Sequence, residues 1–280
     1  MQFSCYATLV IGAEQSGKTT FINHILDNFD TKRSACAVNM DPSTEKSFDF
    51  SIIDIRESCD FKDYLKQYGP KNALPICMEF ILQNEEWFDR CIFSKNVKYM
   101  LFYMPSEMDI LLRVGVLPRL IQILHSVNCN VSIANLLDSQ FVLDPMKFVG
   151  GYLYSMSIVS LMNVPHINIL TKYDLLNEGQ IQDLNRLYLS DDLKIIQYVS
   201  SLNPRFQKMT SKIYALIRSY NFGSFILFDV ADQASIKQCI KILDDKLMYI
   251  QDKDDEEEED NKDDDIDDHE EEIWPQFYRA

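Results

Sequence analysis

The sequence predicts an α/β fold, in which a mostly parallel sheet is flanked by helices and followed by a disordered acidic C-terminal tail. Short apolar segments rich in β-branched and aromatic residues recur along the chain, and longer segments of helical periodicity separate them. This alternation is typical of strand–helix–strand units, whose successive strands run parallel. An acidic run between residues 252 and 272 has almost no apolar side chains with which to build a core.

The expected strands are short apolar runs of the kind that occupy buried positions in a sheet. They span residues 3–11, 35–40, 99–104, 131–137, 166–170 and 224–228. Segments of helical periodicity lie between and after these strands, at residues 18–29, 74–93, 110–126, 145–162, 204–220 and 233–250. The segment 177–203 is polar and irregular, so we expect it to form a surface insertion rather than a second domain.

Charge is concentrated near one end of the chain. Residues 252–272 hold sixteen Asp or Glu against two Lys, so they account for most of the net charge of −16. Such a run repels itself and buries nothing, and we therefore expect one folded domain at residues 1–251 and a disordered tail at 252–280. Solubility and docking of a basic partner are the two roles open to the tail. The rest of the chain is close to neutral, which gives no basic face for direct nucleic-acid contact.

The seven cysteines stand at positions 5, 36, 59, 77, 91, 129 and 239. Their number is odd, no two have CxxC spacing, and most lie within apolar runs. We therefore expect reduced, buried thiols rather than disulfides or a zinc site, as is typical of a cytoplasmic protein. No apolar run reaches the length that spans a bilayer, so no membrane partner is expected.

The octapeptide GAEQSGKT at residues 12–19 carries the strongest chemical signal. It matches the pattern GxxxxGK[ST], follows an expected strand and opens an expected helix, which is the context that this phosphate-binding P-loop requires. Lys18 reaches the β- and γ-phosphates, and the Thr19 hydroxyl ligates Mg²⁺. The expected nucleotide-binding residues are Gly12, Ala13, Glu14, Gln15, Ser16, Gly17, Lys18, Thr19 and Thr20. The alternative is an ordinary glycine-containing turn.

The tetrapeptide TKYD at residues 171–174 follows an expected strand and indicates the base. A carboxylate at Asp174 can accept hydrogen bonds from both N1–H and the exocyclic amine of guanine, whereas adenine presents no such pair of donors. The stem of Lys172 can lie across the purine face, and Thr171 completes the motif. A surface Lys–Asp pair is the alternative, but a P-loop earlier in the chain favours guanine recognition.

With these two motifs, the chain resembles the GPN-loop GTPases. The resemblance covers residues 3–250 and is carried by the segments VNMDPS at 38–43, DIRE at 54–57, GPKNALPICMEF at 69–80, LDSQFVLDPMKF at 137–148 and VPHINILTKYDLL at 164–176. It implies a P-loop GTPase domain with a GPN-type insertion at residues 1–251, with GTP or GDP and Mg²⁺ as cofactors. Asp41, in VNMDPS, is the implied carboxylate near the metal and the attacking water, beside Thr19.

The resemblance also implies partners and a cellular role. It implies action in the assembly and nuclear import of RNA polymerase II, as a heterodimer with a related GPN-loop GTPase, the first paralogue. RNA polymerase II subunits or assembly factors are the further partners implied, and the implied location is the cytoplasm with shuttling to the nucleus. Composition and residue spacing alone imply none of this.

One departure from the family pattern lies in the loop that gives the family its name. That loop reads Gly-Pro-Asn and crosses a dimer interface toward the partner's γ-phosphate, but here Gly69 and Pro70 are followed by Lys71 and then Asn72. Either Asn72 takes over the role of the asparagine or Lys71 replaces it. Both therefore join Asp41 as candidate catalytic residues, with an exposed, inert Lys71 as the alternative.

A second departure concerns the family segment D-x-P-G-Q, which reads Tyr-Met-Pro-Ser-Glu at residues 103–107. Tyr103 cannot supply the carboxylate that orients the magnesium shell, and Glu107 adds negative charge near the γ-phosphate. The chain is therefore either a working GTPase or a nucleotide-binding partner whose hydrolytic parts have decayed. A P-loop kinase or ATPase of another branch is disfavoured by TKYD.

Overall fold

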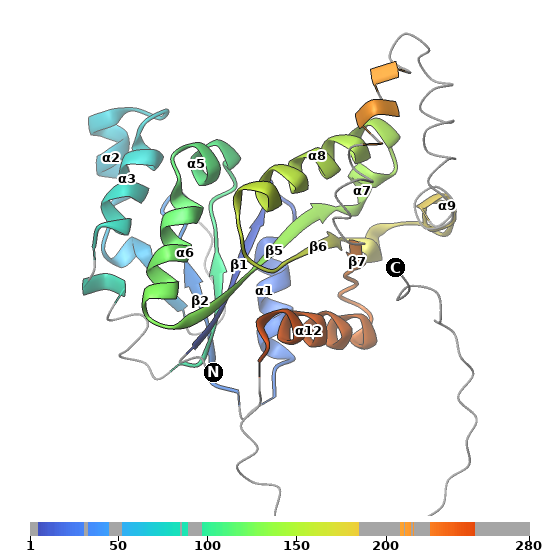
Figure 1. The fold of residues 1–280 in the computed structure, drawn as a ribbon, viewed down its shortest axis with the longest axis horizontal. Helices are drawn as coiled ribbons and strands as arrows, with labels where there is room; N and C mark the ends of the chain where they lie inside the picture. Colours follow the sequence, from blue (N-terminus) through green and yellow to red (C-terminus); the bar gives the residue numbers. More distant parts are fainter. Residues whose placement is uncertain are drawn as a thin grey trace, which may run out of the picture. The chain divides into compact units, whose positions relative to one another are not determined.

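The computed structural model centres on a seven-stranded sheet with helices packed on it (Figure 1). The chain divides into two units, Met1–Tyr249 and Ile250–Ala280. The structure describes residues 5–30, 33–44, 52–84, 86–88, 97–184, 208–209, 211–213, 215 and 225–249. The expected acidic tail at 252–280 lies outside these residues, as does most of the expected helix at 204–220.

The strands form one parallel sheet. They are β1 (Cys5–Gly12), β2 (Ala35–Asn39), β3 (Ile52–Asp54), β4 (Tyr99–Tyr103), β5 (Cys129–Asp138), β6 (His166–Thr171) and β7 (Phe225–Leu227). Their order across the sheet is β3-β2-β4-β1-β5-β6-β7, and each of these pairings is parallel. The predicted α/β fold with a mostly parallel sheet is confirmed. Because the strands share one direction, their carboxyl ends meet at one edge of the sheet.

Helices connect the strands. The described helices are α1 (Lys18–Asp27), α2 (Phe61–Tyr68), α3 (Ala73–Leu82), α5 (Met108–Arg113), α6 (Val116–Ser126), α7 (Ser139–Val142), α8 (Pro145–Leu161), α9 (Glu178–Leu184) and α12 (Gln233–Leu247). Two single turns of 3₁₀ helix, η1 (Ile55–Glu57) and η2 (Tyr173–Leu175), follow β3 and β6. Among the described helices, none combines the length and the apolar character needed to cross a bilayer.

The sheet separates two apolar layers, because successive side chains of each strand point to opposite faces. On β1, Leu9 and Ile11 pack with α3, α6 and the end of α8. Tyr6 and Val10 point the other way and pack with α1 and α12. Every residue of β1 is buried, which explains why this strand has no polar alternation in its sequence.

A charged contact fastens the last described helix to an early part of the chain. Arg33, just before β2, donates from Nη1 and Nη2 to the two carboxylate oxygens of Asp244 in α12, both at 2.8 Å. Its guanidinium lies 4.4 Å from the ring centroid of Phe29 and 4.3 Å from that of Tyr249. This bidentate pair joins residues that are 211 positions apart.

Several elements differ from the sequence-based expectations. The single helix expected at 110–126 is divided into α5 and α6 at Gly115, whose φ of 78° is incompatible with a continuing helix. The helix expected at 74–93 ends at Leu82, and Asn84 then caps a separate turn by accepting from the backbone N–H of Trp87 at 3.1 Å. Neither β3 nor α2 was expected.

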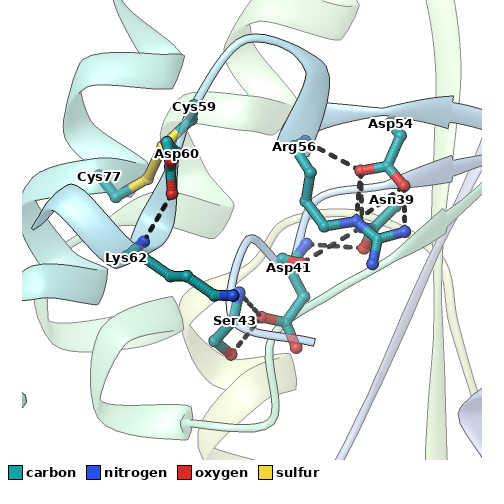
Figure 2. The surroundings of a disulfide bond; sticks show 9 residues. All are labelled: Asn39, Asp41, Ser43, Asp54, Arg56, Cys59, Asp60, Lys62 and Cys77. Carbon is teal, nitrogen blue, oxygen red and sulfur yellow. Dashed lines mark hydrogen bonds and ion pairs between the residues drawn. A yellow bond between two sulfur atoms is a disulfide. The ribbon is translucent and has the colours of Figure 1, made fainter. Parts of the chain in front are cut away.

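The expectation of reduced thiols is wrong for one pair of cysteines. Cys59, which follows η1, is joined by a disulfide to Cys77 in α3 (Figure 2). The two cysteines are 18 residues apart, and it is the α2–α3 hairpin that brings them together, which spacing alone does not reveal. The other described cysteines, Cys5, Cys36, Cys129 and Cys239, are buried and outside any disulfide, as expected.

Candidate functional site

The predicted motifs meet at the carboxyl edge of the sheet. The P-loop joins β1 to α1, Asp41 follows β2, Ser106 follows β4, and Lys172 follows β6. In open parallel sheets, ligands bind in the crevice outside the carboxyl ends of the strands. The fold therefore gathers the phosphate motif and the base motif into one neighbourhood, although 155 residues separate Ser16 from Thr171 in the chain.

Two glycines allow the P-loop to curl. Gly17 caps α1 with a φ of 89°, a left-handed conformation that other residues adopt only with strain. A Cβ added to Gly12 would lie 2.5 Å from Ser16 Oγ and 2.7 Å from the carbonyl oxygen of Leu136. The backbone conformation therefore excludes a side chain at Gly17, and close packing excludes one at Gly12. The loop delivers the N-terminus of α1, with its free N–H groups, to the edge of the sheet.

Lys18 is buried within the loop, with only 4% of its surface exposed. Its Nζ donates to the carbonyl oxygens of Gly12 at 2.8 Å and Ala13 at 3.2 Å, and to the Ser106 hydroxyl at 2.7 Å. The ammonium also lies 5.5 Å from the centroid of the Tyr103 ring. A buried cation surrounded by oxygen acceptors is held ready for an anionic ligand, because phosphate oxygens can replace these acceptors.

Two hydroxyl oxygens of the P-loop are buried without a hydrogen-bond partner, Ser16 Oγ and Thr19 Oγ1. Burying a polar atom unpaired is unfavourable by roughly 1–3 kcal/mol, so such atoms usually mark a site that a ligand completes. Thr19 Oγ1 is the atom that the motif assigns to the magnesium ion. That this oxygen has no hydrogen-bond partner in the structure fits the assignment.

Asp41 is held in a fixed orientation by its neighbours (Figure 2). Its backbone N–H donates to Asn39 Oδ1 at 3.0 Å, and its Oδ1 accepts from the backbone N–H and the hydroxyl of Ser43, at 2.9 and 2.6 Å. The second carboxylate oxygen is turned away from Ser43. Asp41 is 5% exposed, so an oxygen acceptor stands ready at the carboxyl end of β2.

A second carboxylate, Asp54, supports this arrangement from β3. Asn39 Nδ2 donates to Asp54 Oδ1 at 3.0 Å and also to the carbonyl oxygen of Asp41 at 3.2 Å. Arg56 Nε donates to both carboxylate oxygens of Asp54 at 2.9 Å. Burial alone would raise the pKa of Asp54, but the hydrogen bonds from Arg56 and Asn39 outweigh it and lower the pKa.

Together, Thr19 and Asp41 suit a magnesium ion that takes its remaining ligands from phosphates and water. Mg²⁺ prefers oxygen ligands and is usually held by one or two carboxylates plus substrate phosphates. The described residues contain no group of three or more His, Cys, Asp or Glu side chains that could hold a metal by themselves. A metal here would therefore depend on the nucleotide.

Tyr103 ends β4 and is nearly buried. Burial raises the pKa of its phenol, and the negative charge of Asp41 raises it further, whereas the nearby hydroxyls of Thr44 and Thr19 oppose the shift. The Thr19 oxygen is thus close to the phenol without making a hydrogen bond of normal geometry. At this place the chain offers a neutral ring that faces Lys18 rather than a carboxylate.

On the other side of the P-loop, β5 and β6 shape the region of the base motif. Thr171 Oγ1 donates to the carbonyl oxygen of Ser16 at 2.7 Å, which ties the base motif to the P-loop. Lys172, in a left-handed conformation with φ of 59°, donates from Nζ to Asp138 Oδ2 at 2.7 Å. Its carbonyl oxygen accepts from the hydroxyl of Ser139 at 3.0 Å.

The remaining predicted nucleotide contacts lie on the surface around these groups. Asp174, in the turn η2, is exposed, as an acceptor for an incoming base must be. Ala13, Glu14, Gln15 and Thr20 are also exposed, and Gln15 has a left-handed φ of 62° at the tip of the P-loop.

Lys71 and Asn72 are not brought to the P-loop of their own chain. Both are exposed in the connection between α2 and α3, a hairpin that Figure 1 shows beyond α6, away from the junction of β1 and α1. Gly69 ends α2 with a φ of 75°, and Asn72 Nδ2 reaches back to the carbonyl oxygen of Tyr68 at 3.5 Å. The structure therefore leaves both side chains exposed, without a hydrogen bond or ion pair to the described P-loop residues.

Comparison with known proteins shows the family to which the chain belongs. A family model described as a conserved hypothetical ATP binding protein matches residues 10–249. GPN-loop GTPase 3 of Schizosaccharomyces pombe is 30% identical over 256 residues, which are 89% of this chain and 93% of the relative. GPN-loop GTPase 3 of Debaryomyces hansenii is 32% identical over 88% of this chain and 92% of its own. The chain belongs to the GPN-loop GTPase family.

A solved structure shares the fold of this GPN-loop GTPase family member. A GTPase from Pyrococcus abyssi in its apo form superimposes with a TM-score of 0.71 and covers 89% of this chain and 100% of its own, at 17% identity. Both relatives described above are named GPN-loop GTPase 3. This agrees with the third eukaryotic paralogue, which the segments DSQF at 138–141 and FILFDVAD at 225–232 favour from sequence.

Sequence reasoning missed some of the residues that build the site of this GPN-loop protein. Asp138 had no distinct role as part of LDSQF, but the register of the sheet sets it opposite Thr171, so its place beside Lys172 follows from the pairing of β5 with β6. In sequence, Ser106 was only one residue of the altered segment at 103–107. Nothing in the sequence indicated its bond to Lys18, which spans 88 residues.

Proposed function

We propose that this chain binds guanine nucleotides with Mg²⁺ and acts as a GTPase subunit. The observation that carries the proposal is the P-loop itself, where a buried Lys18 cation stands beside the unpaired oxygens of Ser16 and Thr19. Thr171 links that loop to the motif that contains Asp174. A phosphate cradle joined to a paired acceptor for guanine is what a GTP site requires.

Each residue has a separate task in the proposed mechanism. Lys18 neutralises charge on the β- and γ-phosphates, and Thr19 and Asp41 would hold the metal, which when bound supplies further charge neutralisation on the phosphates. The second carboxylate oxygen of Asp41 also orients a water toward the γ-phosphate. Attack by that water breaks the bond between the γ-phosphorus and the bridging oxygen, which gives GDP and inorganic phosphate. Asn39 and Asp54 keep Asp41 in place.

The proposed setting is a heterodimer with a related GPN-loop GTPase, the first paralogue, in the assembly and nuclear import of RNA polymerase II. RNA polymerase II subunits or assembly factors would be its further partners, in the cytoplasm with shuttling to the nucleus. Membership of the GPN-loop family supports this role. The exposed position of Lys71 and Asn72 supports it as well, because exposed loop side chains are available for contact with a partner.

A second candidate function rests on Tyr103. A phenol stands where the family has a carboxylate, so the chain is alternatively a nucleotide-binding structural subunit that does not hydrolyse GTP and whose partner supplies the intact site. The experiment that separates the two is single-turnover hydrolysis of GTP by the purified chain, alone and with the first paralogue, together with a measurement of the nucleotide each preparation retains. Retention of ATP as readily as GTP would contradict both candidates.

A matched pair of variants tests the contact across the heterodimer. If Lys71 neutralises charge at the partner's γ-phosphate, Lys71→Ala slows single-turnover hydrolysis at the partner's site and leaves this chain's own nucleotide affinity unchanged. Asn72→Ala then has a much smaller effect, and the opposite ranking assigns the role to Asn72. Equal rates for Lys71→Ala and the parent heterodimer rule out the lysine.

A further inference from the structure

Ser106 is the residue beside Lys18 that the P-loop motif does not account for. It lies just past the carboxyl end of β4, the strand next to β1, and its hydroxyl accepts from Lys18 Nζ at 2.7 Å. The side chain is half-buried. A serine hydroxyl is both a donor and an acceptor, so it can serve an ammonium group in one state and a phosphate oxygen in another.

Three acceptors of the Lys18 ammonium, the carbonyl oxygens of Gly12 and Ala13 and the Ser106 hydroxyl, differ in their freedom to move. The carbonyl oxygens of Gly12 and Ala13 belong to the P-loop backbone, which the packing at Gly12 holds in place. The Ser106 oxygen belongs to a side chain that can rotate about χ1. When phosphate oxygens arrive at Lys18, the serine hydroxyl is the acceptor free to reorient, and its proton can then point to the same phosphate.

The direction of approach identifies which phosphate this is. The backbone N–H groups between β1 and α1 surround the α- and β-phosphates in a P-loop, and the lysine bridges the β- and γ-phosphates. Ser106 reaches Lys18 from β4 and not from the P-loop. The same side of the lysine carries Tyr103, which lies near Asp41, the expected metal ligand. We therefore infer that Ser106 faces the γ-phosphate of a triphosphate.

We propose that the Ser106 hydroxyl donates a hydrogen bond to the γ-phosphate and so determines preference for the triphosphate over the diphosphate. The inference rests on the proposed guanine-nucleotide binding and adds a specificity-determining residue to that site. A glycine stands at this place in the family segment D-x-P-G-Q, so the side-chain contact is a property of this chain. With GDP bound, the Ser106 hydroxyl still accepts from Lys18, as it does without nucleotide. Ser106 therefore contributes little to the affinity for GDP.

The test measures dissociation constants for GDP and for a non-hydrolysable GTP analogue, with the full chain and Mg²⁺. Ser106→Ala is expected to weaken binding of the analogue by about tenfold, the effect of losing one hydrogen bond of ~1.4 kcal/mol to a charged group. GDP affinity is expected to change by less than about twofold, a change well under 1 kcal/mol. Ser106→Gly, which restores the family residue, is expected to behave like Ser106→Ala. Ser126→Ala, at the exposed end of α6, is the matched control for removing a hydroxyl.

Three results would overturn the inference. If the Ser106 variants lose affinity equally for GDP and the analogue, Ser106 only positions Lys18. If they gain affinity equally for both, the serine hydroxyl competes with the phosphates for Lys18. Unchanged affinity for the analogue would mean that the hydroxyl stays with Lys18 in all states. Failure of the folded parent chain to bind any guanine nucleotide would instead reject the proposed function, and this outcome is distinguishable because the parent is measured first.

Discussion

At the β6 side of the site, Thr171 and Lys172 of the base motif are paired with other elements, whereas at the β4 side two residues differ from those expected in the family segment D-x-P-G-Q. Thr171 bonds to the P-loop, and Lys172 is held by Asp138. Across the P-loop, Tyr103 offers a ring in place of a carboxylate, and Ser106 stands in place of a glycine.

Nucleotide binding and hydrolysis therefore have separable structural requirements within this one fold. Affinity for a nucleotide depends on the P-loop and the base motif, which this chain retains. Hydrolysis also needs a correctly placed metal and water, and these depend on the β4 side and on Asp41. A chain of this kind is expected to be a better binder than catalyst, and the variants below test the two sides one at a time.

The largest effect is expected at Lys18, which serves both sides. Lys18→Ala removes a buried cation that faces the phosphates, so we expect nucleotide affinity to fall by roughly a hundredfold, or about 3 kcal/mol. The domain stays folded, since the substitution leaves no unpaired charge behind. Titration with GDP and GTP, with a circular dichroism melt of the same sample, measures both effects. Lys71→Ala is the control, and undiminished affinity in Lys18→Ala would make the P-loop merely structural.

The base side is tested by Asp174→Asn. An amide presents one acceptor and one donor where guanine needs two acceptors, so selectivity for GTP over ATP falls by about 1–3 kcal/mol, or roughly 5- to 150-fold. The same amide can donate to the extra carbonyl oxygen of xanthine, so affinity for xanthosine triphosphate rises. Asp138→Asn is the matched control, since it disturbs Lys172 and keeps Asp174. Equal competition by ATP and GTP in the parent would show that this side is not a guanine site.

The β4 side is tested by restoring a carboxylate with Tyr103→Asp. The Mg²⁺ concentration that gives half-maximal GTP binding should fall by about tenfold, because outer carboxylates change metal affinity by 10- to 100-fold. Tyr103→Asn is the control, since it opens a similar cavity without the charge. If the Asp and Asn variants show the same magnesium dependence, a carboxylate at position 103 does not strengthen magnesium binding.

The smallest effect is expected at Asp54, which supports Asp41. Its pKa is lower in the folded chain than in the unfolded chain, so its contribution to stability is present above the unfolded pKa of about 3.9 and is lost as pH falls through the folded pKa. Asp54→Asn should therefore lower the free energy of unfolding by about 1 kcal/mol at pH 7, allowing for the partial exposure of Arg56. Urea unfolding should show that the difference in free energy of unfolding between the parent chain and Asp54→Asn becomes smaller as the pH falls below about 4. If this difference in the free energy of unfolding does not change with pH, the destabilisation by Asp54→Asn arises from packing and not from the charge of Asp54.

Sequence patterns predicted the parts of this fold that depend on local chemistry. The P-loop could be recognised because its glycines, lysine and threonine stand at fixed spacings between a strand and a helix. The long buried strands could be recognised because burial on both faces gives them uninterrupted apolar sequences. By contrast, β3 is an edge strand of three residues, too short for a pattern. The helix α2 has apolar residues at helical spacing, Phe61, Tyr64, Leu65 and Tyr68, and Phe61 and Tyr64 pack against the core, so this helix was missed although the sequence carries its pattern.

Contacts between distant segments could not be predicted in the same way. The break between α5 and α6 depends on one glycine conformation, and a glycine within a helical pattern does not by itself announce a break. The partners of Lys18 and Lys172 come from other strands, so finding them required the strand order and register. The disulfide between Cys59 and Cys77 likewise depends on the hairpin between them.

The bond between Arg33 and Asp244 has a consequence for synthesis of the chain. Phe21 and Ile25 of α1 lie in the same buried apolar cluster as Ile236 and Leu243 of α12. A ribosome adding about 5–20 residues per second completes the 211 residues between Arg33 and Asp244 in roughly 10–40 s. Throughout that interval the apolar face of α1 on the nascent chain lacks its cover, so we expect it to need a chaperone. Chains truncated before residue 233 should be protease-sensitive, and a protease-resistant truncated chain would show that α1 packs without α12.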